Sequence, residues 1–273
     1  MTGNPLDGYD RTTFTHDGKE RDVFRRGTGP AVVVIAEMPG ITPKVVTLAD
    51  RIVDLGCTAV LPHLFGEPGR DPFADGRLAG ARATLTALVP TCISREFTVM
   101  ATGRTSPVID WLRALAAAEH ERCGGPGVGA VGMCFTGGFA LAMATSPTLV
   151  APVLSQPSLP LGPTERWRRT IDISPDDLAV VKGRCAAEGL EVLGLRFTGD
   201  PLVPGDRFAF LREELGDAFV GVELDDAHAN TDSPLRAHSV LTEHLIDEPG
   251  QPTRDALDQV LDLFRRKLLA APG

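Results

Sequence analysis

The chain has 273 residues, of which 43% are hydrophobic and 23% are charged, as is usual for a globular protein with a substantial core. Its formal net charge of −9 is spread along the sequence, which argues against nucleic acid or an anionic membrane as a partner, because both bind basic surfaces. The N-terminal stretch MTGNPLDGYDRTTFTHDG has no basic start followed by an apolar core, so no signal peptide is expected, and no apolar run approaches the ~20 residues of a membrane-spanning helix.

Apolar runs alternate with amphipathic stretches from the first third of the chain onward. Strands are predicted at 12–14, 31–36, 57–65, 127–133, 149–154, 191–197 and 219–224. Helices are predicted at 44–55, 78–88, 106–119, 135–144, 175–188, in a segment that ends at 215, and in two stretches after His228. This alternation predicts a single α/β domain over residues 1–273, with a mostly parallel central sheet and helices on both faces.

The cysteines give no sign of a disulfide framework or a metal site. They are five in number, form no C-x-x-C pair, and stand far apart at Cys57, Cys92, Cys123, Cys134 and Cys185. The six histidines do not cluster with them. We therefore expect reduced thiols in a cytoplasmic protein, with no bound metal.

Cys134 stands where a predicted strand gives way to a helix, in the sequence VGMCFTGG. A nucleophile on such a turn needs small residues two positions to either side, and Gly132 and Thr136 occupy those positions. The start of the helix also offers backbone N–H groups and a positive dipole end that stabilise a thiolate. A buried structural cysteine beside a glycine-rich packing point would show the same local sequence, so both readings stay open here.

A thiol nucleophile needs a base and a group that orients the base. Asp200, in TGDPLVP, and His228, in DDAHAN, each follow a later predicted strand. The order nucleophile, acid, histidine is that of an α/β-hydrolase triad, and all three positions fall where parallel strands end. Glu37 also follows a buried strand, where it either contacts the thiol or is a solvated turn residue; the local sequence does not separate the two.

These segments resemble the dienelactone hydrolase family. GMCFTGG is similar to its cysteine elbow, IAEMPG to its glutamate turn, TGDPLVP to its aspartate loop and DDAHAN to its histidine loop, and LGCTAVLPHLFGEPG is similar to its second strand and following loop. The resemblance implies an α/β-hydrolase fold with Cys134 as nucleophile, His228 as base and Asp200 as the orienting acid.

The same resemblance implies that Glu37 contacts the resting thiol and that the backbone N–H groups of Met38 and Phe135 form an oxyanion hole. It implies hydrolysis of a small ester or lactone through an acyl-thioester, without a metal or organic cofactor. Two alternatives remain: a hydrolase-fold binding or regulatory protein with a degenerate site, and an acyltransferase that uses the same acyl-enzyme. The sequence leaves a monomer and a homodimer equally open.

The sequence departs from the family pattern at two positions that bear on the substrate. Thr136 replaces the glycine that commonly stands two residues after the cysteine, and a threonine there is expected to narrow the site. Asp232 stands four residues after His228, where the dienelactone enzymes carry an arginine, and an acid there would repel a carboxylate substrate. Arg95 and Arg104 are candidates for a second substrate-binding arginine of the family. A solvated arginine on the surface would have the same local sequence, so this alternative stays open for each.

Overall fold

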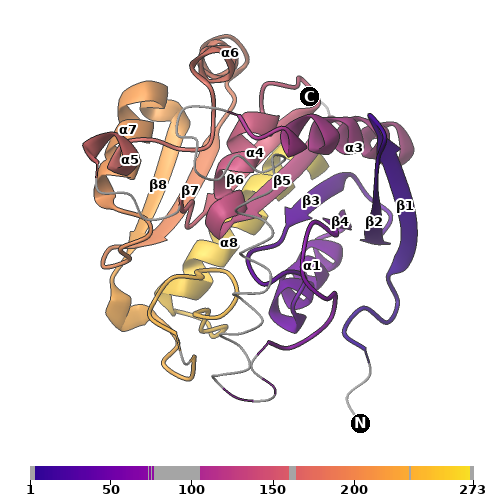
Figure 1. Ribbon diagram of the computed structural model, residues 1–273, viewed down its shortest axis with the longest axis horizontal. Coiled ribbons are helices and arrows are strands. Elements are labelled where there is room, and N and C mark those ends of the chain that lie inside the picture. Colours follow the sequence, from indigo (N-terminus) through magenta and orange to yellow (C-terminus); the bar gives the residue numbers. More distant parts are fainter. Residues whose placement is uncertain are drawn as a thin grey trace.

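The computed structural model describes residues 4–72, 74, 76, 105–159, 164–233 and 235–270 (Figure 1). Within them eight strands form one sheet in the order β1-β2-β4-β3-β5-β6-β7-β8. The strands are β1 (Asp10–His16), β2 (Lys19–Arg26), β3 (Ala31–Ile35), β4 (Thr58–Pro62), β5 (Val128–Met133), β6 (Leu149–Ser155), β7 (Val192–Phe197) and β8 (Phe219–Leu224). Neighbours from β4 to β8 run parallel, whereas β2 is antiparallel to both β1 and β4.

Helices connect most of these strands. They are α1 (Pro43–Asp54), α3 (Val108–Cys123), α4 (Gly137–Met143), α5 (Glu165–Arg168), α6 (Pro175–Glu188), α7 (Gly205–Leu215) and α8 (Pro252–Phe264). Short 3₁₀ turns lie at η1 (Cys134–Thr136), η2 (Gly216–Ala218) and η3 (Asp226–His228), and α8 continues as a π-helical segment, η4 (Arg265–Leu269). The helices lie on both sides of the sheet, which confirms the predicted α/β-hydrolase architecture (Figure 1).

Side chains of the central strands are buried on both faces of the sheet. Along β3, Val33 and Ile35 belong to the buried cluster on the side of α3 and α4, while Val32 and Val34 belong to the cluster on the opposite side, with α1 and α8. Successive side chains of a strand point to opposite faces, so a strand covered on both sides needs an unbroken apolar run. The sequence AVVVI meets that requirement, and all five residues are fully buried.

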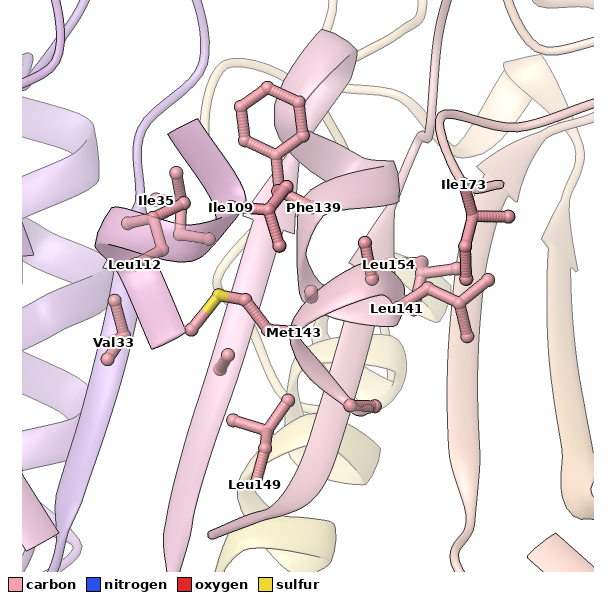
Figure 2. Packing of buried hydrophobic residues seen from close by; sticks show 14 of the residues in the cluster. Val33, Ile35, Ile109, Leu112, Phe139, Leu141, Met143, Leu149, Leu154 and Ile173 are labelled. Carbon is pink, nitrogen blue, oxygen red and sulfur yellow. The ribbon is translucent and has the colours of Figure 1, made fainter. Parts of the chain in front are cut away.

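Helix α4 is enclosed along its whole length, as its uniformly apolar sequence predicts. Phe139 and Met143 point toward Ile109 and Leu112 of α3 (Figure 2). On its other side Leu141 lies near Leu154 of β6 (Figure 2). All seven residues of α4 are buried, so the helix that follows Cys134 is held firmly between α3 and the sheet.

Three sequence predictions differ from the structure or fall outside it. Strand β2 was not predicted, because KERDVFRR is rich in charge and its first residues are exposed in a hairpin with β1. Two helical stretches were predicted after His228, but the described residues there contain one α-helix, α8, with its π-helical extension. The helix predicted at 78–88 lies outside the described residues.

Candidate active site

The parallel strands end at one edge of the sheet, and polar side chains follow four of them there. Glu37 comes after β3, Cys134 after β5, Gln156 after β6 and Asp200 after β7. Open α/β sheets bind their ligands at this edge. The parallel register therefore brings together groups that are far apart in the sequence.

Cys134 has the backbone geometry predicted for a nucleophile. Its φ is 56°, a left-handed conformation that is uncommon for a residue other than glycine. The turn is tight, because a Cβ on Gly132 would lie 2.1 Å from the carbonyl oxygen of Thr136. Strand β5 thus passes directly into η1, with the cysteine lifted out of the turn.

Thr136 does not line the site as the sequence suggested. Its side chain is fully buried, and its hydroxyl accepts a hydrogen bond from Met133 N–H at 2.9 Å. The hydroxyl oxygen also lies 3.0 Å from the carbonyl oxygen of Ile35, to which it can donate. The prediction that Thr136 narrows the substrate site is therefore wrong: the hydroxyl joins the turn at Cys134 to the end of β3.

Asp200 bonds a histidine, but this histidine is His238. His238 Nδ1 lies 2.6 Å from Asp200 Oδ2, and Asp200 Oδ1 accepts from the backbone N–H of Leu202 at 2.9 Å. The Asp200 side chain is 1% exposed and that of His238 is 17% exposed. A buried carboxylate on Nδ1 fixes the ring and leaves Nε2 for the reacting group.

His228 as the partner of Asp200 is a prediction that the structure contradicts. It ends the turn η3, directly after β8, and its side chain is exposed. Two aspartates hold this turn at the surface: Asp225 accepts from Ala227 N–H and Asp226 accepts from Gly199 N–H, each at 2.8 Å. The chain returns to Asp200 only ten residues later in the sequence, at His238.

Asp232 loses its expected role together with His228. It is exposed, and its backbone N–H donates to Asn230 Oδ1 at 3.0 Å in a surface turn. The residue four positions after His238 is Thr242, whose hydroxyl donates to Glu37 Oε1. The prediction that Asp232 repels a carboxylate substrate is therefore wrong, and Arg95 and Arg104 lie outside the described residues.

The electrostatic surroundings of His238 favour its charged form. Burial lowers the pKa of His238, but the nearby Cys134 sulfur and the Asp200 carboxylate raise it more, to well above the ordinary value. Nε2 is buried and has no hydrogen-bond partner among the described residues. The imidazole ring therefore lies near the Cys134 sulfur and carries the Asp200 carboxylate on its Nδ1 side.

A second histidine holds the segment that carries His238. His244 Nδ1 accepts from the backbone N–H of Ser239 at 3.2 Å, and His244 Nε2 lies 3.2 Å from the carbonyl oxygen of Leu235. Only a neutral ring, with its proton on Nε2, can make both bonds. Burial lowers the pKa of His244, which keeps the ring neutral.

Glu37 is buried but does not contact the thiol as the resemblance implied. Its Oε2 accepts from Gln156 Nε2 at 3.0 Å and from Ser239 Oγ at 2.6 Å, and its Oε1 accepts from the Thr242 hydroxyl. The hydrogen-bond partner of the Cys134 sulfur is instead Ser158 Oγ, at 3.1 Å. The expected Glu37–Cys134 contact is replaced by a network that joins three loops.

Few features of the sequence point to His238, Gln156 and Ser158. One usable signal was the setting of His238 in LRAHSVL, where Ala237 and Val240 are apolar and become buried. His228 stands among aspartates and asparagine, which is typical of a surface turn. No local pattern pointed to Ser158, because its contact with Cys134 exists only through the packing of β5 beside β6.

Other features of the described residues bear on the class of protein. No group of three or more His, Cys, Asp or Glu side chains in them is placed to hold a metal ion. None of the described helices has the length and apolar character to cross a membrane. Cys57, Cys123, Cys134 and Cys185 are free thiols.

The fold and the site have the features of the α/β-hydrolase class. These are a mostly parallel eight-stranded sheet, a cysteine on a strained strand-to-helix turn, and an acid–histidine pair at the carboxyl edge. The model of the dienelactone hydrolase family matches residues 23–172, which is more than half of the sequence. The chain belongs to the dienelactone hydrolase family. Comparison with the curated proteins gave no match.

Solved structures of hydrolases share the fold at low sequence identity. A dienelactone hydrolase-like promiscuous phosphotriesterase from metagenomic libraries has a TM-score of 0.57 at 17% identity, over 95% of this chain and 98% of its own. The 2,6-dihydroxy-pseudo-oxynicotine hydrolase gives 0.57 at 16% identity, over 97% of this chain and 70% of its own. A zinc-bound cold-adapted esterase from an Arctic intertidal metagenomic library has a TM-score of 0.53 at 15% identity, over 95% of this chain and 93% of its own.

Proposed function

We propose that this protein hydrolyses a small carboxylic ester or lactone through Cys134, with His238 as base and Asp200 as the acid that orients it. The observation that carries the proposal is that Cys134, at φ 56° on its turn, lies near His238, whose Nδ1 is 2.6 Å from Asp200 Oδ2. The family and the esterase among the structural neighbours support a hydrolase of this kind.

The proposed reaction begins with attack of the Cys134 thiolate on the carbonyl carbon, while His238 carries the proton. The backbone N–H group of Met38, after β3, and that of Phe135, within η1, would stabilise the oxyanion, each by roughly 3 kcal/mol. Collapse of this intermediate breaks the ester bond, and His238 Nε2 gives its proton to the departing alkoxide. His238 then takes a proton from water, which attacks the thioester and releases the acid and the thiol.

The proposal is tested by hydrolysis of a short-chain p-nitrophenyl ester. We expect Cys134→Ala to lower kcat/KM by at least about 10³-fold, because the nucleophile is removed. Cys185→Ala, a half-buried cysteine on α6, is the matched control and should leave the rate unchanged. Equal rates for wild type and Cys134→Ala would contradict the assignment of Cys134 as nucleophile and favour a binding or regulatory protein. In a separate assay, alcohols or thiols are added, and the products formed distinguish hydrolysis from acyl transfer.

Thiol reactivity gives an independent test. Burial raises the pKa of Cys57 to about 11 and also raises the pKa of Cys185, so both should alkylate slowly near neutral pH. We expect iodoacetamide to modify Cys134 much faster than these two, as mass spectrometry of the digested protein would show. Similar rates at all sites would contradict the proposed thiolate.

A further inference from the structure

Ser158 touches the sulfur that the proposed reaction uses. Its Oγ lies 3.1 Å from Cys134 Sγ, and its backbone N–H donates to the carbonyl oxygen of Cys134 at 2.9 Å. The residue is 5% exposed. Two contacts, one through the backbone and one through the side chain, therefore fix the hydroxyl against the thiol.

Residues 156–158, which follow β6, form an arm that carries this hydroxyl. Gln156 has a φ of 34°, and its backbone N–H donates to the carbonyl oxygen of Leu195 at 2.7 Å. The arm passes so close to the nucleophile helix that a Cβ on Gly137 would lie 2.6 Å from Pro157 Cα. Behind it, the carbonyl oxygen of Pro157 accepts from the buried Arg207 guanidinium at 2.9 Å.

Glu37 connects this arm to the segment that carries His238. Its carboxylate binds the side-chain amide of Gln156 on one side and the hydroxyls of Ser239 and Thr242 on the other. The Gln156 Oε1 in turn accepts from the backbone N–H of Val240 at 3.2 Å. With three donors on two oxygens, the carboxylate is engaged in positioning its neighbours.

We propose that the Ser158 hydroxyl is the hydrogen-bond donor that holds the Cys134 thiolate in the resting protein, and that Glu37 acts on the site only through Gln156 and Ser239. A hydroxyl that donates to a thiolate stabilises its charge and directs the sulfur, and it is released when the sulfur bonds to carbon. The inference rests on the proposed function in taking Cys134 as the nucleophile, and it is independent of which ester is cleaved.

The titratable groups around this sulfur are His238, Asp200 and Glu37. His238 faces it from the segment after β8, with Asp200 behind the ring, and Glu37 lies beyond Gln156 and Ser239. Removal of the Ser158 hydroxyl makes the thiolate harder to form. Glu37→Gln removes no group that touches the sulfur, so it does not make the thiolate harder to form. The two substitutions therefore differ in their effect on the reactivity of Cys134.

The test measures the rate of Cys134 alkylation by iodoacetamide against pH, read by mass spectrometry of the full chain. Ser158→Ala should move the midpoint of the profile upward by about one pH unit, which is about tenfold in thiolate fraction. Above the midpoint its rate should exceed that of wild type, since a thiolate without its donor is more nucleophilic. Ser158→Thr should restore the wild-type profile, because it keeps the hydroxyl, and Glu37→Gln should leave the midpoint in place or lower it.

An unchanged profile for Ser158→Ala, in protein shown by circular dichroism to be folded, would overturn the inference. So would an upward shift in Glu37→Gln, which would make Glu37 the partner of the thiol. If wild-type Cys134 alkylates no faster than Cys57 and Cys185, the inference and the proposed function both fail. If Cys134 is selectively reactive but no ester is hydrolysed, only the proposed function fails.

Discussion

His238 Nδ1 lies 2.6 Å from Asp200 Oδ2, while His228 is exposed on the turn that follows β8. The two histidines are ten positions apart in the sequence, and both precede α8. They form a matched pair for mutagenesis, since one is held by a buried carboxylate and the other faces solvent.

His238→Ala should therefore lower kcat/KM for a p-nitrophenyl ester by about 10³-fold or more, because the proposed base that takes the proton of Cys134 is removed. His228→Ala should have the activity and the Tm of wild type, since an exposed side chain makes little contribution to either. Steady-state kinetics of the two variants decide the point. A large loss in His228→Ala together with an active His238→Ala would reverse the assignment.

Thr136 connects the turn at Cys134 to the end of β3. Thr136→Val removes the acceptor of Met133 N–H and the group that bonds Ile35 O. We expect the free energy of unfolding to fall by about 2 kcal/mol, because buried polar groups lose their partner, and kcat to fall because the two proposed oxyanion amides lie on the joined segments. Thr136→Ser keeps the hydroxyl and should recover most of both. Urea denaturation measures the free energy of unfolding, and steady-state kinetics measure kcat. A Thr136→Val variant as stable and active as wild type would contradict the role of the hydroxyl in joining the turn to β3.

Arg207 on α7 is fully buried and bonds backbone carbonyl oxygens of several loops. The acceptors are Pro157, Leu202, Trp167 and Thr170, at 2.7–3.0 Å. Burial lowers the pKa of Arg207 to about 10, and Asp200 opposes that change. Arg207→Met should lower the free energy of unfolding by about 3 kcal/mol or more, since several buried carbonyls lose a charged donor.

Arg212 provides the comparison on the same helix. It pairs with Glu223 at 2.6 Å, and its side chain is 46% exposed, so Arg212→Met should cost less than about 1 kcal/mol. Chemical denaturation of both variants tests the difference. Similar losses in the two would show that Arg207 does not hold the loops in the way that its hydrogen bonds indicate.

Asp172 makes the stability depend on pH. Burial raises the pKa of this carboxyl to about 7, against an opposing hydrogen bond from Ser106 Oγ at 2.5 Å. The folded protein therefore binds this proton more tightly than the unfolded chain, so the contribution of Asp172 to stability falls as pH rises from about 4 to about 7. Asp172→Asn keeps an acceptor for Ser106 without the charge. We expect the stability of the variant relative to wild type, measured as the difference in free energy of unfolding, to be about 2 kcal/mol greater at pH 8 than at pH 5.

Denaturation of both proteins at the two pH values measures this difference. The wild type serves as its own control, because every other titrating group is common to both proteins. Parallel curves for wild type and Asp172→Asn would show that Asp172 keeps an ordinary pKa in the folded state.

Local sequence patterns were enough to predict the parallel sheet and the tight turn at Cys134. The run AVVVI requires a strand buried on both faces, and the glycine before Cys134 permits the turn that places this residue at φ 56°. Asp200 was also found, because a residue that directly follows a parallel strand must lie at the carboxyl edge. These features are local, and the spacing of apolar residues and glycines encodes them.

The histidine that bonds Asp200 and the side chain that contacts Cys134 could be identified only from the folded chain. Between β8 and α8 the chain follows turns without a repeating pattern, so spacing alone does not show whether His228 or His238 returns to the edge of the sheet. In the same way, the contact of Ser158 with Cys134 depends on the pairing of β6 with β5 and on the arm after β6. Periodicity records which face of an element is buried, whereas contacts between loops depend on the three-dimensional path of the chain.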